Sequence, residues 1–290
     1  MDWKALLAAY QRKIEEALVA YAARWPRYGE LQAAMAYSLL SGGKRIRPVL
    51  TLAVCELFGG QAERALPLAC GLEMVHTYSL IHDDLPCMDD DDLRRGKPTN
   101  HKVYGEAVAT LAGDGLLTAA FETLASAGLP ATAVVRAVTC LSQAAGPAGM
   151  VGGQVLDLLG EGKSLTEAEI TAVQRLKTGC MIEAAARLGA IAAGSAPEQE
   201  EAAAAYARHL GLAFQIRDDL LDVLGEEATF GKPIGSDAAN EKSTFVTLLG
   251  VEASQRRVEE LTRRAVDCLS PYPGRDFLCS LAQSLAIRNK

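Results

Sequence analysis

Apolar residues recur every three to four positions along almost the whole chain, and this spacing predicts helices. Runs with the period-two alternation typical of strands are nearly absent. The chain is therefore predicted to be all-α. The predicted helices cover 2–24, 29–41, 47–58, 62–88, 105–127, 131–145, 147–160, 166–193, 198–224, 242–269 and 274–288.

Glycine residues mark the ends of several predicted helices. Gly42 and Gly43 follow the second helix, and Gly59 with Gly60 follows the third, because glycine adopts left-handed backbone conformations at little cost. An S-x-x-E pattern at 164–167, Ser164 with Glu167, predicts a capping box that opens the helix at 166. No linker-like or repeated stretch interrupts the chain. We therefore expect one domain over 1–290, although the length alone is compatible with about two.

Composition excludes several classes of protein. The 290 residues include 29 basic and 36 acidic side chains, and the net charge of −7 gives no overall attraction to nucleic acid or anionic membranes. The seven cysteines form no C-x-x-C pair, so neither a zinc site nor a disulfide framework is predicted. No apolar run has the length of a membrane span, and the N-terminus lacks the pattern of a secretion signal. We expect a cytoplasmic protein.

A first acidic cluster holds six carboxylates between Asp83 and Asp92. Like charges at this density repel one another, so a divalent cation with oxygen ligands is a candidate partner. In an unbroken helix Asp89 would lie about 240° round from Asp83. Pro86 must distort such a helix, and the distortion could bring Asp89 back towards Asp83. The alternative is an acidic loop exposed to solvent.

A second acidic cluster has the sequence DDLLD over 218–222. Asp218 and Asp222 are four residues apart and share one helix face, among apolar neighbours. Alone, this pattern is usually a solvated helix face. Two acidic helix faces can also meet across a cavity, as they do in the carboxylate metal sites of helical bundles.

Basic residues suited to phosphate accompany these acids. The GGKRIRP loop (42–48) places Lys44, Arg45 and Arg47 just before a helix, where guanidinium groups and the helix N-terminus favour phosphate oxygens. Arg94 and Arg95 follow the first acidic cluster, as internal counter-ions or as phosphate ligands. His76 lies two helical turns before Asp83. The other candidates, each more often a surface residue when alone, are Lys177, Thr178, Lys232 and Lys242.

With these features together, the sequence resembles the trans-isoprenyl diphosphate synthase family. DDLPCMD resembles the first aspartate-rich motif of that family, and DDLLD resembles the second. EMVHTYSLIHDD, GMVGGQVLDLLG, LKTGCMIEAAARLGA and the closing IRNK also match, so the resemblance spans essentially the whole chain. Within the family, the sequence is most similar to the bacterial enzymes that make farnesyl diphosphate.

The resemblance implies the isoprenoid synthase fold, a single large antiparallel helical bundle around a deep central cavity, with the two aspartate motifs facing each other at its mouth. It implies an Mg²⁺-dependent prenyltransferase, acting as a homodimer, that condenses isopentenyl diphosphate with dimethylallyl or geranyl diphosphate into (2E,6E)-farnesyl diphosphate. The allylic C–O bond would ionise as cations neutralise the leaving diphosphate, the isopentenyl double bond would attack, and a proton would leave to the diphosphate.

The resemblance also implies roles for individual residues. Three Mg²⁺ ions would be held by Asp83, Asp89 and Asp218, with Asp84 and Asp222 in support. The allylic diphosphate site would comprise Arg94, Lys177, Gln215 and Lys232, with Phe214, Thr178 and Lys242 beside them. The isopentenyl diphosphate site would comprise Lys44, Arg47, His76 and Arg95. The residues expected to carry the chemistry are Asp83, Asp84, Asp89, Arg94, Lys177, Asp218 and Lys232.

Product length is expected to depend on Tyr78 and Ser79, about one helical turn upstream of Asp83. Tyr78 would form a floor under the growing chain; its alternative role is an ordinary core aromatic residue. In family terms, an aromatic residue here together with the Pro86-Cys87 insertion suits a farnesyl product. Synthases of longer chains often carry the same DDLPCMD, however.

One position departs from the family pattern. Glu241 stands before Lys242 where relatives commonly have glycine, which puts the role of Lys242 in doubt.

Three other functions stay open. A geranylgeranyl diphosphate synthase would keep the same site. A non-catalytic partner subunit would bind prenyl diphosphates or a synthase without turnover, which intact acids and basic positions argue against. A terpene cyclase would not need the second diphosphate site.

Overall fold

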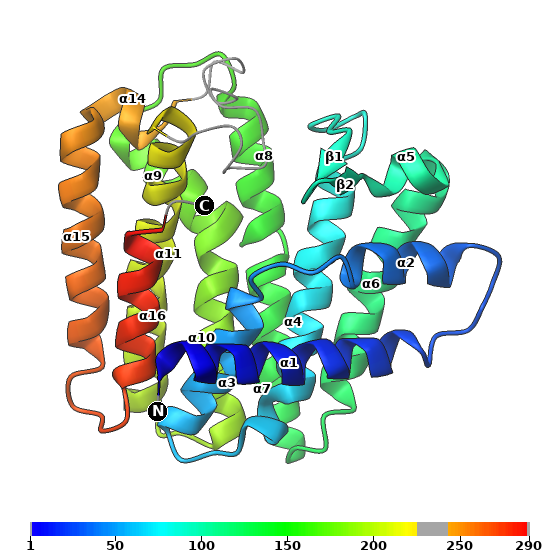
Figure 1. Ribbon diagram of the computed structural model, residues 1–290, viewed down its shortest axis with the longest axis horizontal. Helices are drawn as coiled ribbons and strands as arrows, with labels where there is room; N and C mark the ends of the chain where they lie inside the picture. Colours follow the sequence, from blue (N-terminus) through cyan, green and yellow to red (C-terminus); the bar gives the residue numbers. More distant parts are fainter. Residues whose placement is uncertain (1, 225–242, 289–290) are drawn as a thin grey trace. The chain divides into compact units, whose positions relative to one another are not determined.

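Helices form throughout the part of the chain that this computed structural model describes, residues 2–224 and 243–288 (Figure 1). The all-α prediction is confirmed. These residues divide into two units, Met1–Val138 with Ile191–Gly194 (unit 1) and Thr139–Ala190 with Ser195–Lys290 (unit 2). Two such units can belong to one domain, so a single domain over 1–290 stays a prediction. No helix in the described part of the chain combines the length and the apolar composition that crossing a bilayer requires.

Unit 1 contains the N-terminal helices and one small hairpin. Its elements are α1 (Trp3–Ala22), α2 (Leu31–Leu39), α3 (Ile46–Leu57), α4 (Ala62–Asp83), β1 (Leu93–Arg94), β2 (Lys97–Pro98), α5 (Asn100–Tyr104), α6 (Glu106–Ala125) and the first part of α7 (Ala131–Ala145). The antiparallel pair β1–β2 and the short helix α5 have no counterpart in the elements predicted from the apolar spacing. Both are too short to show a periodic pattern.

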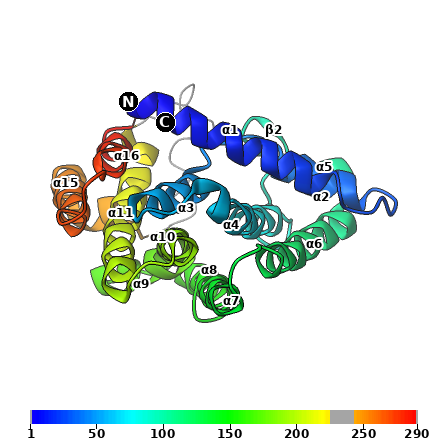
Figure 2. The same cartoon turned by 90° about the horizontal axis from the view of Figure 1, so that it is seen from below.

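The core of unit 1 forms around α4, which lies between α3 and α6 (Figure 2). Eight consecutive residues of α3, from Pro48 to Cys55, are buried. The backbones of α4 and α6 approach closely at Gly71, where an added Cβ would lie 2.2 Å from Leu124 and 2.9 Å from the Ala120 carbonyl oxygen. This close approach packs α4 against α6 in the middle of α4, ahead of the acidic residues at its C-terminal end.

The predicted helix 62–88 ends earlier, at Asp83. Pro86 has no N–H and its ring would collide with the carbonyl group of residue 82 in a continued helix, so the chain turns instead. The turn is closed by hydrogen bonds from the Met88 and Asp90 N–H groups to the Leu85 carbonyl oxygen. The acidic cluster therefore occupies a helix end and a turn.

Unit 2 contains the remaining helices. They are the end of α7, α8 (Met150–Gly160), α9 (Glu167–Gln174), the π-helical turn η1 (Arg175–Gly179), α10 (Cys180–Ala193, whose last three residues belong to unit 1), α11 (Pro197–Leu224), α14 (Phe245–Leu249), α15 (Val251–Cys268) and α16 (Asp276–Ala286). Helix α11 packs against α15 and α16 (Figure 1). Apolar residues of α9, α11, α14 and α15 form one core cluster, which includes Ile170, Ile216, Phe245 and Leu261.

The predicted helix 166–193 differs from the structure in two ways. The capping box that opens it is formed by Thr166 with Glu169 and not by Ser164 with Glu167. In this register Leu165 and Ile170 flank the cap and join the same apolar cluster, as in a hydrophobic staple. The helix is also interrupted by η1, which separates α9 from α10.

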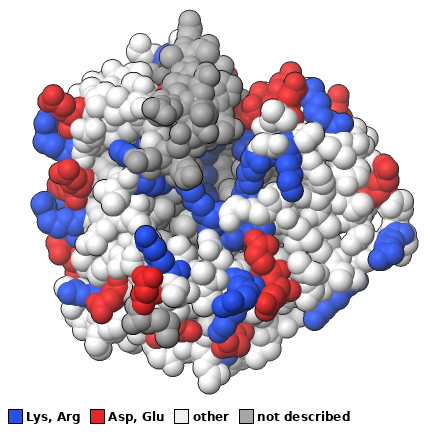
Figure 3. All heavy atoms as spheres, viewed as in Figure 1, with Lys and Arg blue, Asp and Glu red and all other residues white. Residues whose placement is uncertain are grey.

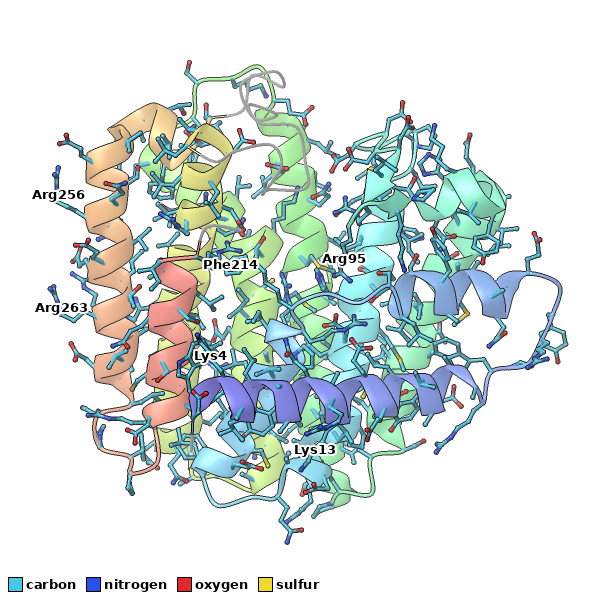
Figure 4. All side chains as sticks on the ribbon, viewed as in Figure 1. Lys4, Lys13, Arg95, Phe214, Arg256 and Arg263 are labelled. Atoms are coloured by element: carbon cyan, nitrogen blue, oxygen red, sulfur yellow. The ribbon has the colours of Figure 1, made fainter. Side chains whose placement is uncertain are left out.

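The predicted helix 242–269 is two helices in its described part. Thr244 caps α14 by accepting a hydrogen bond from the Thr247 N–H at 3.1 Å. Gly250 then has a φ of 81°, which no residue inside a right-handed helix adopts, and α15 starts after it. Arg256 and Arg263 of α15 point away from the unit 2 core (Figure 4).

Candidate active site

The C-terminal end of α4 brings Asp83 and Asp89 together in unit 1. The Asp89 N–H donates a hydrogen bond of 2.8 Å to the Asp83 carbonyl oxygen, across the turn that Pro86 causes. The prediction that Pro86 returns Asp89 towards Asp83 is therefore confirmed for the backbone. Asp90, next in the turn, has a φ of 50°, a left-handed conformation that is uncommon for a non-glycine residue. Acidic side chains gather beside basic ones over this end of α4 (Figure 3).

Arg94 neutralises part of this acidic cluster. Its Nε donates to Asp84 at 2.6 Å, and its Nη2 lies 3.2 Å from Asp91. Asp84 is buried, so the pair is shielded from water. Burial lowers the pKa of Arg94, but the hydrogen bond to Asp84 and the charges of Asp84 and Asp91 outweigh it, so the pKa is raised. Of the two roles open for Arg94, the structure shows the internal counter-ion; its side chain is 20 % exposed, which leaves one edge towards solvent.

The basic loop before α3 divides into two kinds of residue. Arg45 is buried, with Nε 2.7 Å from Glu15 and Nη1 2.7 Å from Glu73. Its charge is compensated inside the fold, so the expectation of three phosphate-facing cations on this loop is wrong for Arg45. Lys44 is exposed, and its carbonyl oxygen accepts a hydrogen bond of 2.8 Å from Gln11 of α1.

Arg47 and His76 lie next to each other, as the resemblance implied for one diphosphate site. Arg47 Nη1 is 3.2 Å from His76 Nε2. An arginine can only donate, so Nε2 accepts and the imidazole is neutral with its proton on Nδ1. Burial, followed by the charges of Arg47, Arg95, Arg94 and Arg45, holds the pKa of His76 well below 6.5. Several cations around one neutral ring create a positive field that favours an anion.

Arg95 belongs to the same positive region. Its Nη1 donates to the Gly42 carbonyl oxygen and lies 3.3 Å from Ser41 Oγ, so the guanidinium covers the loop between α2 and α3 (Figure 4). A Cβ on Gly43 would lie 2.7 Å from Arg95 Cζ, and Gly43 has a φ of 125°. Glycine at this position therefore serves the close approach of Arg95 as well as the turn.

Tyr78 and Ser79 lie on α4, about one helical turn before its acidic C-terminal end. Tyr78 is 7 % exposed, and its ring contacts the His82 ring edge to face, with centroids 5.6 Å apart. Burial raises the pKa of the Tyr78 phenol, with a smaller effect from Asp83. Ser79 Oγ donates to the His76 carbonyl oxygen at 2.9 Å. The role of both residues in product length stays a prediction.

The carboxylates of unit 1 suit a hard divalent cation by their chemistry. Among residues 2–224 and 243–288, no group of three His, Cys, Asp or Glu side chains is placed to hold a metal ion by itself. Mg²⁺ typically takes one or two carboxylates and completes its shell with water and substrate phosphate oxygens. Asp83 and the exposed Asp89 offer this kind of donor set, since the backbone hydrogen bond places the two residues side by side.

In unit 2, Lys177 lies on η1 and forms an ion pair with Asp157 of α8. The Nζ–Oδ2 distance is 2.6 Å, and the two side chains are 27 % and 21 % exposed. Glycine on α8 makes this pairing possible, because a Cβ on Gly153 would lie 2.1 Å from the Lys177 backbone nitrogen. Lys177 and Gln215, both expected at the allylic diphosphate, line one pocket together with Asp157, Gln174 and Asp219. Thr178, next to Lys177, does not line it.

The three carboxylates of the second aspartate motif have different surroundings. Asp219, which no role was predicted for, lines the pocket; its Oδ2 accepts from Gln174 at 3.0 Å and from the Phe245 N–H at 3.2 Å. Asp222 is buried, at 5 % exposure. Asp218 is bound by Arg288, with 2.5 Å between Oδ1 and Nη2. Asp218 and Asp222 share a face of α11, and the Asp218 side chain is the more exposed of the two, at 35 %.

Arg288 gathers several predicted residues around itself. Its guanidinium lies 3.8 Å from the centroid of the Phe214 ring and donates to the Phe214 carbonyl oxygen at 3.3 Å. Arg217 donates to the Arg288 carbonyl oxygen at 2.9 and 2.6 Å. Phe214 lies beside the C-terminal end of α16 (Figure 4). The chain end is thereby attached to the second aspartate motif.

Some predicted residues lie outside the described part of the chain. These are Lys232, Lys242 and the departure at Glu241. The two aspartate motifs belong to different units, so their expected placement across a cavity stays a prediction.

Sequence reasoning missed Asp157, His82 and Arg288. Asp157 stands three residues after Gln154 in GGQVLDLLG, and Arg288 stands in the closing IRNK; both stretches matched the family without a role being assigned. His82 directly precedes the first aspartate motif, and its position against α6 has no local sequence signal.

Comparisons with known proteins agree with this arrangement. The family model described as polyprenyl synthetase matches residues 29–269. The farnesyl diphosphate synthase of Geobacillus stearothermophilus is 49% identical over 251 residues, 86% of this chain and 84% of that protein. The chloroplastic heterodimeric geranylgeranyl pyrophosphate synthase large subunit 1 of Arabidopsis thaliana is 48% identical over 268 residues, 89% of this chain and 72% of that protein.

A solved structure agrees with the fold as well. The apo crystal structure of an FPP/GFPP synthase from Zymomonas mobilis superposes with a TM-score of 0.88, at 37% identity, covering 98% of this chain and 99% of that one. The all-α isoprenoid synthase fold is thus confirmed. With two aspartate-rich motifs in its sequence, Arg47 in contact with His76, and a family match over most of its length, the chain belongs to the polyprenyl synthetase family and is a trans-prenyltransferase.

Proposed function

We propose that this prenyltransferase condenses isopentenyl diphosphate with dimethylallyl or geranyl diphosphate and releases (2E,6E)-farnesyl diphosphate. The observation that carries the proposal is the contact of Arg47 with a neutral His76 among three further arginines, next to the acidic end of α4. A prenyl chain-elongation enzyme must bind two diphosphates. This positive region would bind one diphosphate directly through protein cations. The acids of α4 would bind the other diphosphate through a metal ion.

Isopentenyl diphosphate would bind at Lys44, Arg47, His76 and Arg95. Arg47 and Arg95 would donate to diphosphate oxygens, and the left-handed backbone of Arg95 directs its side chain back over the glycine loop. A neutral His76 adds no charge of its own. It accepts a hydrogen bond from the Arg47 guanidinium and so fixes its orientation. The arginine side chain therefore loses less conformational entropy when the anion binds.

The allylic diphosphate would bind in part through residues of unit 2. Lys177, held by Asp157, and Gln215 line the same pocket and would contact its oxygens, and Lys232 and Lys242 are further expected ligands. Asp83 and Asp89, with Asp84 in support, and Asp218, with Asp222 in support, would hold Mg²⁺. When bound, this ion neutralises charge on the leaving diphosphate and so assists ionisation of the allylic C–O bond.

The remaining steps follow from positioning. Arg47 and Arg95 would hold the diphosphate of isopentenyl diphosphate so that its double bond faces the allylic carbon. After the allylic C–O bond has ionised, this double bond would attack the carbocation and form the new C–C bond. The proton lost from the adjacent carbon would pass to the departing diphosphate, since no histidine or carboxylate in the described part of the chain is an obvious alternative base. Arg94, already paired to Asp84, would balance the charge of that buried acid.

The farnesyl product depends on Tyr78. Its side chain is buried on α4 one turn before Asp83, so a chain growing along α4 would meet its ring. Geranylgeranyl diphosphate is the second candidate product, favoured by the 48% identity to a geranylgeranyl pyrophosphate synthase subunit. Product length after incubation with labelled isopentenyl diphosphate, each allylic primer and Mg²⁺ separates the two.

Three outcomes of that incubation are informative. A fifteen-carbon product supports the proposal, and a twenty-carbon product assigns the second candidate. Absence of turnover by the purified chain contradicts catalysis by the chain alone and supports the alternative of a non-catalytic subunit.

A variant tests the assignment of the two diphosphate sites. Arg47→Ala should raise the KM for isopentenyl diphosphate far more than the KM for geranyl diphosphate. An equal rise in both KM values would contradict the assignment.

A homodimer is the proposed assembly. Helix α8 exposes Val151, Val155 and Leu159 at the spacing of one helix face, and a second copy of the chain would cover this face. Light scattering of the purified protein tests the state. A monomeric mass at micromolar concentration would contradict the proposal, and Val155→Asp should lower the mass of a dimer to that of one chain.

A further inference from the structure

His82 occupies a place between Tyr78 and α6 for which the proposed reaction assigns no role. It stands on α4 four residues after Tyr78 and directly before Asp83. The rings of His82 and Tyr78 meet at an interplanar angle of 77°, with centroids 5.6 Å apart. Edge-to-face ring pairs attract each other and restrict both rings. The orientation of Tyr78 is therefore coupled to that of His82.

The other side of the His82 ring is tied to α6. His82 Nε2 lies 3.0 Å from the Thr110 carbonyl oxygen. A carbonyl oxygen only accepts, so this nitrogen carries the proton and donates. Asp114 Oδ1, one turn further along α6, is 3.9 Å from the same nitrogen and favours the N–H on that side. The imidazole thus points its Nε2–H group at α6 and has a defined direction.

Gly113 makes room for this ring. A Cβ at Gly113 would lie 2.1 Å from His82 Nε2 and 2.4 Å from Cδ2, closer than any real contact. The imidazole edge therefore occupies the space that a side chain at position 113 of α6 would need. Since α4 and α6 also approach closely at Gly71, the ring is held between two helices that cannot readily separate.

We propose that His82 is a positioning residue for product length, which locks the Tyr78 ring in the orientation that closes the pocket. The inference rests on the proposed role of Tyr78 as the floor. On a helix an aromatic side chain has two accessible χ1 rotamers. Contact with a His82 anchored to Thr110 selects one of them, so a growing prenyl chain meets a ring that does not turn aside.

The experiment measures the ratio of twenty-carbon to fifteen-carbon product from isopentenyl and geranyl diphosphates. The variants are His82→Ala, Tyr78→Ala and the double substitution. His209→Ala is the matched control, a partly exposed helical histidine of unit 2. We expect a several-fold rise for His82→Ala, a larger rise for Tyr78→Ala and no further rise in the double variant, because His82 acts through Tyr78. The control should match the wild type.

The outcomes separate the two ideas. A rise for Tyr78→Ala with an unchanged ratio for His82→Ala overturns the positioning role and leaves the floor intact. An unchanged ratio for Tyr78→Ala overturns the floor, and with it the inference. Additive rises in the double variant also overturn the inference. If His82→Ala fails to fold, His82→Gln keeps an N–H for the Thr110 carbonyl oxygen but lacks the ring, and the same rise is expected.

Discussion

The guanidinium of Arg288 binds Asp218 at 2.5 Å while stacking on Phe214, so the last described residue of the chain is the counter-ion of the second aspartate motif. Arg288 is mostly buried, whereas the Asp218 side chain is 35 % exposed. The contact therefore connects the end of the chain to α11 by a charged hydrogen bond and by a cation–π contact.

Replacing Arg288 by Ala should lower the free energy of unfolding by about 1 kcal/mol, a modest loss because water partly screens Asp218. Urea unfolding measures it. Arg263→Ala, an exposed arginine of α15, is the control and should change the unfolding free energy by less than about 0.5 kcal/mol. Equal midpoints for Arg288→Ala and the wild type would contradict a stabilising role for the contact.

Asp157→Asn should weaken catalysis through Lys177. The carboxylate that holds the ammonium at 2.6 Å becomes a neutral amide, and Lys177 loses a charged partner worth about 1.5–3 kcal/mol. We expect kcat/KM for the allylic substrate to fall about tenfold or more, with the KM for isopentenyl diphosphate little changed. Glu259→Gln, an exposed acid of α15, should keep wild-type kinetics. A loss confined to isopentenyl diphosphate would contradict the assignment of Lys177.

His76 should make the protein less stable in acid. Its pKa in the fold lies well below 6.5, because of burial and the surrounding arginines. Above pH 6.5 the ring is neutral in both states, and the full stability is present. As the pH falls below 6.5, the unfolded chain binds a proton that the folded chain refuses, so the free energy of unfolding decreases by up to about 1.4 kcal/mol per pH unit.

The measurement compares urea unfolding of the wild type and His76→Gln between pH 7 and pH 5. The variant should lose less stability across this range, because glutamine does not titrate. His209, whose pKa is also lowered, mainly by burial, contributes in the same direction, so His209→Gln serves as the reference for a histidine outside the site. Parallel curves for His76→Gln and the wild type would show that His76 titrates alike in both states.

Gly153→Ala should disturb the allylic site. The new Cβ would lie 2.1 Å from the Lys177 backbone nitrogen, so α8 and η1 would have to separate, at a cost of about 1–3 kcal/mol in stability. Gly179→Ala is the matched control within η1, since its Cβ would meet the Gln174 carbonyl oxygen at an ordinary 3.5 Å. Thermal unfolding and kcat/KM for geranyl diphosphate together test this. A Gly153→Ala protein as stable and active as the control would contradict the close approach.

The helical class and most helix positions could be predicted from sequence because they depend on local apolar spacing. The end of α4 before Pro86 follows from the covalent structure of proline, yet the exact hydrogen bonds that return Asp89 to Asp83 depend on the whole turn. The sequence predicts a Ser164 cap before α9, whereas Thr166 forms the cap; in that register Leu165 packs on the unit 2 core, a contact that the local pattern does not show.

The candidate site was less predictable where the partners are far apart in the chain. The motifs identified Arg47 and His76, which do meet. Arg45 has the same chemistry in the same loop, but Glu15 and Glu73 bind it, and nothing in the local sequence distinguishes it from its neighbours. The same holds for Lys177 with Asp157 and for Asp218 with Arg288, whose pairing is decided by helix packing.

The π-helical turn at Arg175–Gly179 changes which residues of α9 and α10 share a helix face. A π turn holds one residue more than an α turn, which shifts the helical phase by about 100°. The side-chain stripes of α9 and α10 are consequently out of register, although the two helices run on without a loop. The buried positions of α10 are therefore displaced by one residue from those that the spacing of α9 predicts beyond Ile170. Deleting one residue from η1 would realign the two helices and turn Lys177 away from Asp157.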